Sequence, residues 1–157
     1  MKFSLATKIL ISSLGCLILG SLSGIATGGA VNGWYAQIAK PSWNPPNWLF
    51  GPVWTVLYLQ MGAAFALVWN GQGKNKRMAM ILFVVQFVLN LLWSFLFFAL
   101  ARMDLALIEI IVLWVFILLS IFSFYKLNRT AAYLLVPYLL WVSFASVLNA
   151  TLVFLNA

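Results

Sequence analysis

Aromatic and amide side chains recur about one helical turn apart in the apolar parts of this chain. One apolar run carries Trp54 and Tyr58, and another carries Tyr138, Trp141 and Asn149. Spacings of three or four residues place side chains on one face of a helix. Indole and phenol rings gathered on such faces form a flat apolar wall that holds planar molecules by stacking. The sequence therefore predicts a pocket for a planar, largely apolar small molecule.

Residues for acid–base or metal chemistry are scarce. The 157 residues include no histidine, a single cysteine, Cys16, and two acids against nine Lys and Arg. The sequence thus lacks the commonest zinc ligand, catalytic base and axial haem ligand. It also lacks phosphate-loop and nucleophile motifs. These features exclude conventional hydrolases, kinases and metalloenzymes, and we expect no metal site and no required cofactor.

The composition is that of an integral membrane protein. Hydrophobic residues make up 65% of the chain and charged residues 7%, far from the balance of a soluble domain. A helix needs about 20 apolar residues to cross the hydrocarbon core of a bilayer, and five runs of that length occur. We predict one all-α membrane domain over residues 1–157, a bundle of five transmembrane helices. The predicted helices are about 5–26, 50–69, 78–101, 105–125 and 131–155.

The loops between these runs differ in charge. Only Lys40 and Arg102 fall on the side of the predicted bundle opposite the N-terminus. The cations on the N-terminal side are Lys2, Lys8, Lys74, Lys76, Arg77, Lys126 and Arg129. By the positive-inside rule we predict a cytoplasmic N-terminus and an outside C-terminus in a bacterial inner membrane. The basic clusters are too small to indicate nucleic-acid binding.

One predicted connection, residues 27–49, is long. Its bulky rings are Trp34, Tyr35, Trp43 and Trp48. Such rings also form belts at the membrane surface, but their density here, with several prolines, favours a stiff lid over the pocket. We expect Gly28, Gly29 and Gly33 to turn the chain out of the first helix, and Pro52 to occupy the first turn of the second.

Other polar residues fall inside the predicted helices. Asn90 and Asn149 either line a cavity or bond neighbouring helices together, and the sequence leaves both roles open. For Glu109 we favour pairing with Arg102 near the membrane surface. Pro137 predicts a kink in the last helix, because a proline removes a backbone hydrogen bond.

Four motifs along the chain carry a resemblance to a known family. They are Trp34-Tyr35 with Lys40-Pro41-x-Trp43-x-Pro45-Pro46-x-Trp48; Gly51-Pro52-Val53-Trp54-Thr55-x-Leu57-Tyr58; Gln86-x-x-Leu89-Asn90-x-x-Trp93-Ser94; and Pro137-Tyr138-Leu139-x-Trp141-x-x-Phe144-Ala145 with Leu148-Asn149. Together they resemble the translocator protein family, also known as TspO or the peripheral benzodiazepine receptor. The resemblance covers nearly the whole chain.

The resemblance implies a five-helix bundle, often dimeric, whose ligand pocket is roofed by the first loop. Family ligands are porphyrins such as protoporphyrin IX, benzodiazepine-type drugs and, in animals, cholesterol. Trp54 and Trp141 match tryptophans associated in the family with light-dependent porphyrin breakdown. Motif matches and spacing together give the predicted ligand-binding residues: Tyr35, Trp54, Tyr58, Asn90, Trp93, Glu109, Tyr138, Trp141, Ala145 and Asn149.

Two departures indicate a bacterial-type member. Animal proteins of the family have a tryptophan at the position of Leu105 and a C-terminal sterol-recognition segment, which is not found before Ala157. We therefore expect no cholesterol binding. The expected partners are a porphyrin or similar planar molecule, the lipid bilayer and a second copy of the chain. Gly20, Gly24 and Gly28, four residues apart, permit close helix contact within one chain or across a dimer.

Three functions remain open. The first is a porphyrin-binding translocator or regulator, in which a metal-free porphyrin needs no axial ligand and Lys40 is a candidate partner for a propionate. The second is a light-dependent porphyrin-degrading enzyme that uses Trp54 and Trp141. The third is a structural or assembly protein whose polar residues only join helices.

Overall fold

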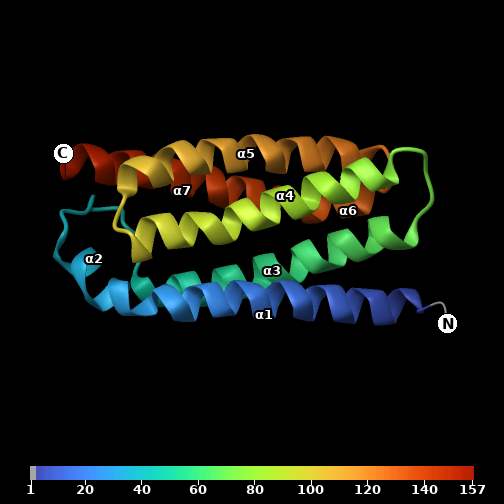
Figure 1. Ribbon diagram of the computed structural model, residues 1–157, viewed down its shortest axis with the longest axis horizontal. Coiled ribbons are helices and arrows are strands. Elements are labelled where there is room, and N and C mark those ends of the chain that lie inside the picture. Colours follow the sequence, from blue (N-terminus) through green and yellow to red (C-terminus); the bar gives the residue numbers. More distant parts are fainter. Residues whose placement is uncertain (1–2) are drawn as a thin grey trace.

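The computed structural model describes residues 3–157, so Lys2 of the predicted charge pattern lies outside the described residues. The helices are α1 (Leu5–Asn32), α2 (Trp34–Gln37), α3 (Asn47–Asn70), α4 (Lys76–Ser94), α5 (Met103–Tyr125), α6 (Arg129–Leu134) and α7 (Val136–Leu155), and a π-helical turn, Phe95–Ala99, continues α4 (Figure 1). Five spans are long and apolar enough to cross a membrane, α6 and α7 together forming the last. No strand occurs in this part of the chain. The predicted all-α fold with five spans is confirmed.

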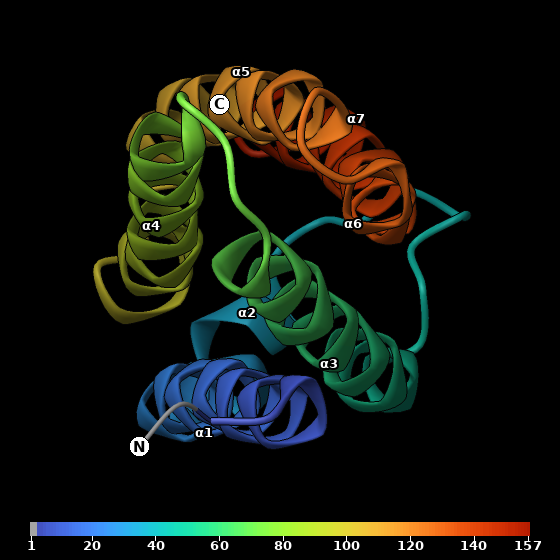
Figure 2. The same ribbon diagram turned by 90° about the vertical axis from the view of Figure 1, so that its right-hand side faces the viewer.

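The five spans lie along one axis, and the two termini lie at opposite ends of the bundle (Figure 1). One end carries the start of α1 and the links 71–75 and 126–128, and we call it the N-terminal end. The other end carries residues 33–46, which we call the lid segment, the link 100–102 and the C-terminus. Seen end-on, the spans follow one another in the order α1, α4, α5, α7 and α3 (Figure 2).

Helix α1 is longer than predicted and ends at Asn32. The prediction that Gly28 and Gly29 turn the chain was wrong, since both stay helical. The chain turns at Gly33, whose N–H donates to the Ala30 carbonyl at 3.2 Å. A helix keeps its backbone groups paired where water is scarce, which outweighs the weak helix propensity of glycine.

Helix α3 begins three residues earlier than predicted. Pro46 precedes it with φ −63° and ψ 143°, so the helix starts at Asn47. The predicted place of Pro52 in the first turn is therefore wrong. Pro52 lies inside the helix, where it cannot donate to the carbonyl of Trp48. The predicted loop 27–49 is thereby shortened to the lid segment, which contains the single turn α2.

The last span is broken, as Pro137 predicts. Helix α6 ends at Leu134 and α7 begins at Val136, with Leu135 between them. Pro137 has no N–H to donate and sits at the start of α7, where no donor is needed. The break at Leu135 lies three residues before Tyr138, whose side chain is fully buried.

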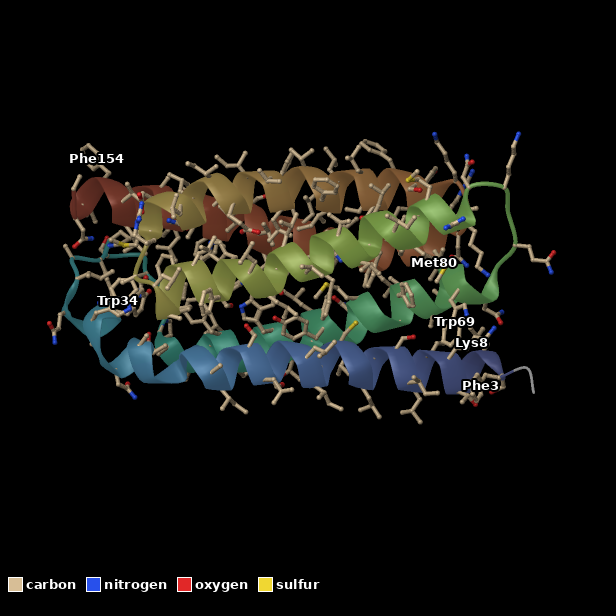
Figure 3. The ribbon with its side chains drawn as sticks, in the orientation of Figure 1. Phe3, Lys8, Trp34, Trp69, Met80 and Phe154 are labelled. Atoms are coloured by element: carbon tan, nitrogen blue, oxygen red, sulfur yellow. The ribbon has the colours of Figure 1, made fainter. Side chains whose placement is uncertain are left out.

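The charges separate between the two ends. The described cations at the N-terminal end are Lys8, Lys74, Lys76, Arg77, Lys126 and Arg129. Figure 3 shows Lys8 beside Trp69 at this end, with the ammonium 5.3 Å from the ring centroid. Lys40 and Arg102 lie at the lid end, where Trp34 is also seen. The predicted placement of these loops on two sides of the bundle is thus confirmed.

Candidate ligand-binding cavity

A cavity of about 420 Å³ occupies the half of the bundle nearer the lid. Helices α1, α3 and α7 and the end of α4 with its π turn form the walls, and α2 reaches the cavity from the lid. Its aromatic lining residues are Tyr35, Phe50, Trp54, Tyr58, Trp93, Phe97, Phe98, Trp141 and Phe144. Ligand pockets in proteins are of this size and are lined by such apolar rings.

The α3 wall is a stack of two rings on successive turns. Trp54 lies over Tyr58 with 5.3 Å between ring centroids and 30° between planes. The Tyr58 hydroxyl donates to Asn90 Oδ1 of α4 at 3.0 Å. A ring that is stacked on one side and hydrogen-bonded at its tip has little freedom to turn. Asn90 therefore positions Tyr58 and lies behind the ring, outside the lining.

The α4 wall centres on Trp93. Its ring stacks on Phe97 at 5.0 Å, and its indole N–H donates to Asn149 Oδ1 at 3.2 Å. The Asn149 amide donates in turn to the carbonyl of Met103 at 2.9 Å. Asn149 lines the cavity, but both ends of its amide are engaged by the protein. Its observed role is to hold the plane of Trp93.

The α7 wall is set by Trp141. Its ring contacts Phe144 at 5.5 Å and Phe50 of α3 at 5.9 Å between centroids. Ala145 also lines the cavity, one turn further along α7, and its small side chain leaves room beside the indole. Trp54 and Trp141, which are far apart in sequence, thus lie on two walls of one cavity.

The lid is fastened by polar contacts. Tyr35 is 4% exposed, and its hydroxyl donates to Asn44 Oδ1 at 3.2 Å. Burial raises the pKa of Tyr35, so the phenol stays protonated. The Lys40 ammonium lies 4.8 Å from the Tyr35 ring centroid and donates to the Ile38 carbonyl at 3.2 Å. The Trp34 indole donates to the Phe98 carbonyl at 3.0 Å.

Seven of the predicted ligand-binding residues line the cavity: Tyr35, Trp54, Tyr58, Trp93, Trp141, Ala145 and Asn149. Asn90, Glu109 and Tyr138 do not, and all three are buried. The predicted pairing of Glu109 with Arg102 is wrong. Arg102 pairs instead with the exposed Asp104 at 2.7 Å. Two residues of separation bring Asp104 within reach, whereas Glu109 points inward and is 8% exposed.

Helix α1 supplies lining residues that the sequence did not indicate. They are Leu17, Gly20, Ser21, Gly24, Ile25 and Val31. A Cβ built at Gly20 would overlap the ring of Tyr58, so this glycine gives the ring its space. The four-residue glycine spacing was a usable signal for close approach, although it did not reveal that an aromatic ring fills the gap.

Asn90 and Asn149 do join helices, as the alternative prediction for them required, through their bonds to Tyr58, Trp93 and Met103. A further link that the sequence did not indicate joins α5 to α7, where the Trp114 indole donates to the Ser143 hydroxyl at 2.8 Å. Within residues 3–157 no group of three or more His, Cys, Asp or Glu side chains comes together. The chemistry on offer is stacking, apolar contact and hydrogen bonding.

The fold and the cavity define a class of protein, a polytopic α-helical membrane protein with an aromatic cavity beside the lid segment. The sequence profile of the TspO/MBR family matches residues 12–155. The chain therefore belongs to the TspO/MBR family, and the resemblance seen in the sequence is confirmed.

Named relatives agree with this assignment. The chain is 45% identical over 143 residues to the "Tryptophan-rich protein TspO" of Chlorobaculum tepidum, covering 90% of each chain. It is 41% identical over 93 residues to the protein of that name in Archaeoglobus fulgidus, covering 59% of this chain and 61% of the relative. It is 43% identical over 77 residues to the "Translocator protein" of Homo sapiens, covering 47% and 46%. The chain thus spans under two thirds of the archaeal relative and under half of the human one.

Proposed function

We propose that this protein binds a tetrapyrrole of the protoporphyrin IX type in the aromatic cavity and acts as its membrane translocator or regulator. A planar benzodiazepine-type molecule is the second ligand class proposed for the same cavity. One observation carries the proposal: Trp54, Trp93 and Trp141 line three walls of one apolar cavity beneath a fastened lid. Large flat rings gain most from such walls, through stacking and burial.

The propionates of a porphyrin need a polar outlet. Lys40 lies in the lid segment, with its ammonium over the Tyr35 ring that borders the cavity. An ammonium held there can meet a carboxylate at the mouth while its alkyl chain stays on the apolar surface. The tetrapyrrole core would then lie among the rings and the acidic edge would face the lid.

A dark titration of the purified protein with protoporphyrin IX tests the proposal, with tryptophan fluorescence quenching as the signal. We expect saturable quenching, and about tenfold weaker binding for Trp54→Ala and Trp141→Ala. Trp48→Ala is the matched control, because Trp48 is 71% exposed and outside the lining. Quenching that rises linearly without saturation would reject the proposal. If the variants then lost only thermal stability, the structural or assembly role would be favoured.

A light-dependent activity is the second candidate, because Trp54 and Trp141 line the same cavity. An excited porphyrin bound there, or the oxygen species that it generates, would react beside both indoles. Trp141→Phe keeps an aromatic wall and should still bind porphyrin in the dark while losing turnover in light. Unchanged turnover in light would reject this candidate.

We further propose that the N-terminal end faces the cytoplasm of a bacterial cell, since the basic links gather there. In a Cys16→Ala background, a membrane-impermeant thiol reagent added outside should label Lys40→Cys and spare Lys74→Cys. Labelling of Lys74→Cys and not of Lys40→Cys would show that the N-terminal end faces the outside instead. A homodimer, the assembly proposed from the family, would show a doubled mass by native mass spectrometry.

A further inference from the structure

A second hollow, of about 590 Å³, lies at the N-terminal end. Its rim carries Lys74, in the link before α4, and Arg77, in the first turn of α4. Gly73 and Lys76 also line it, and an apolar strip forms the rest of its wall: Phe65 of α3 with Met80, Ile81, Val84 and Val85 of α4. It shares no lining residue with the aromatic cavity. The hollow is therefore a separate feature with a different chemistry, a basic rim above an aliphatic strip.

The cations on this rim have no acidic partner. In the described part of the chain the single ion pair joins Arg102 and Asp104 at the lid end. The remaining acid, Glu109, lies in the half of α5 nearer the lid. The side chains of Lys74 and Arg77 form no hydrogen bond or ion pair with any residue in the described part of the chain. Two unpaired charges at one rim favour a negatively charged ligand.

The neighbouring Lys76 has a different role. Its ammonium donates to the carbonyls of Trp69 and Gly71, the second at 2.9 Å. Trp69 lies in the last turn of α3 and Gly71 directly follows the helix, so Lys76 caps the C-terminus of α3. The charge available to a ligand is accordingly that of Lys74 and Arg77.

The shape of the hollow suits an amphiphile. Arg77, Ile81 and Val84 are spaced i, i+4 and i+7 and share one face of α4. From Arg77 to Val85 this face runs about 12 Å along the helix axis, at about 1.5 Å per residue. Because α4 crosses the membrane, the cation lies at headgroup level and the aliphatic strip descends toward the acyl chains. A small anion would use the rim and leave the strip uncovered.

We propose that this hollow is a binding site for one anionic phospholipid, whose phosphate lies between Lys74 and Arg77 and whose acyl chain lies along Ile81 and Val84. The net charge of the headgroup decides which phospholipid binds. A zwitterionic lipid brings its own ammonium to a rim that is already cationic, whereas an anionic headgroup does not. The site is independent of the function proposed for the aromatic cavity.

Native mass spectrometry of the detergent-released protein tests this, with phosphatidylglycerol and phosphatidylcholine of identical acyl chains as probes. The wild-type protein should retain phosphatidylglycerol in preference. The double variant Lys74→Gln/Arg77→Gln should bind it about tenfold more weakly. The matched control, Lys126→Gln/Arg129→Gln, removes two charges from the same end outside the hollow, and should stay within about twofold of wild type.

A second variant tests the apolar half of the site. Val84→Trp leaves the charge unchanged and fills the strip, so retention of phosphatidylglycerol should also fall. Val84 is half exposed, and unchanged protoporphyrin binding and thermal unfolding would show that the variants fold normally. Equal retention of the two lipids by wild type, or an equal loss in the control pair, would overturn the proposal. Competition by free glycerol phosphate as strong as that by the whole lipid would also overturn it, in favour of a simple anion site.

Discussion

Helices α1 and α3 meet in two different ways along their length. Toward the N-terminal end they touch backbone to backbone, where a Cβ built at Gly62 would overlap the main chain of Ser13. Toward the lid they form two walls of the aromatic cavity, with Gly20 facing the ring of Tyr58. One pair of helices is therefore closed at one end and open at the other.

Side-chain size accounts for the difference. Where α3 presents glycine to α1, the two backbones approach directly, as small residues allow in membranes. Where α3 presents Trp54 and Tyr58, the rings hold the helices apart and enclose space. The close contact in the closed half limits how the two helices can move, and the open half contains the cavity proposed to bind the ligand. This division predicts that changes in the closed half affect stability and changes in the open half affect ligand affinity.

The largest effect is expected from Gly62→Ala. The added methyl group meets main-chain atoms of α1, which cannot rotate aside, so the helices must separate. Overpacking of this kind costs about 1–3 kcal/mol, measured as a lower unfolding temperature in detergent. Gly15→Ala is the control, since a Cβ there meets no atom within 4 Å. If both variants unfolded at the same temperature, the closed contact would not be a source of stability.

Gly20→Ala should act on the open half. Its methyl group meets the Tyr58 ring, which the bond to Asn90 and the stack on Trp54 hold in place. The ring must move toward the cavity, and protoporphyrin binding should weaken about tenfold. Gly51→Ala is the control, because it lines the same cavity with no atom within 4 Å of the new Cβ. Unchanged affinity for Gly20→Ala in the dark titration would contradict the proposed fit between the two helices.

The fastening of the lid should have a smaller effect, on rates. Asn156 accepts from the Ala39 N–H at 2.9 Å and donates to its carbonyl at 3.0 Å, joining the C-terminus to the lid segment. Each such bond is worth about 1 kcal/mol or less at a partly exposed site. Asn156→Ala should therefore speed porphyrin release a few-fold in stopped-flow fluorescence.

Thr151→Ala is the control for the lid variant, since within residues 3–157 the Thr151 hydroxyl bonds only to the Val147 carbonyl of its own helix. A dissociation rate that is equal in the two variants would show that the lid is not held by this contact.

The sequence was sufficient for the spans and for much of the cavity wall. Apolar runs of membrane length located all five spans, and the spacing of Trp54 and Tyr58 placed both rings on one face, as observed. Pro137 predicted the break before α7. These features are local, because they depend on residues within a few turns of one another.

The failures at the candidate site had two causes: one charge was paired without regard to its nearest neighbour in sequence, and contacts between distant elements could not be read from spacing. The pairing of Glu109 with Arg102 was assigned from charge alone. It ignored Asp104, which lies only two residues from Arg102 and, like Arg102, is exposed. The α1 wall was missed because periodicity identifies a face of a helix without naming the helix opposite. The role of Asn149 was left open for the same reason, since its partners Trp93 and Met103 lie 56 and 46 residues away in sequence.

The smallest effect is expected from Ser13→Ala, within the closed half itself. The Ser13 hydroxyl donates to the Leu59 carbonyl of α3 at 3.0 Å and is buried. Hydrogen bonds between membrane helices contribute about 0.6 kcal/mol on average, so the unfolding temperature should fall slightly and porphyrin affinity should not change. The control is Ser12→Ala, because the hydroxyl of Ser12 makes no hydrogen bond in the described part of the chain.

If Ser13→Ala weakened porphyrin binding as much as Gly20→Ala does, the two halves of the α1–α3 pair would be coupled. The separation of a stabilising half from a binding half would then be wrong, because a change confined to the closed contact would have altered the cavity.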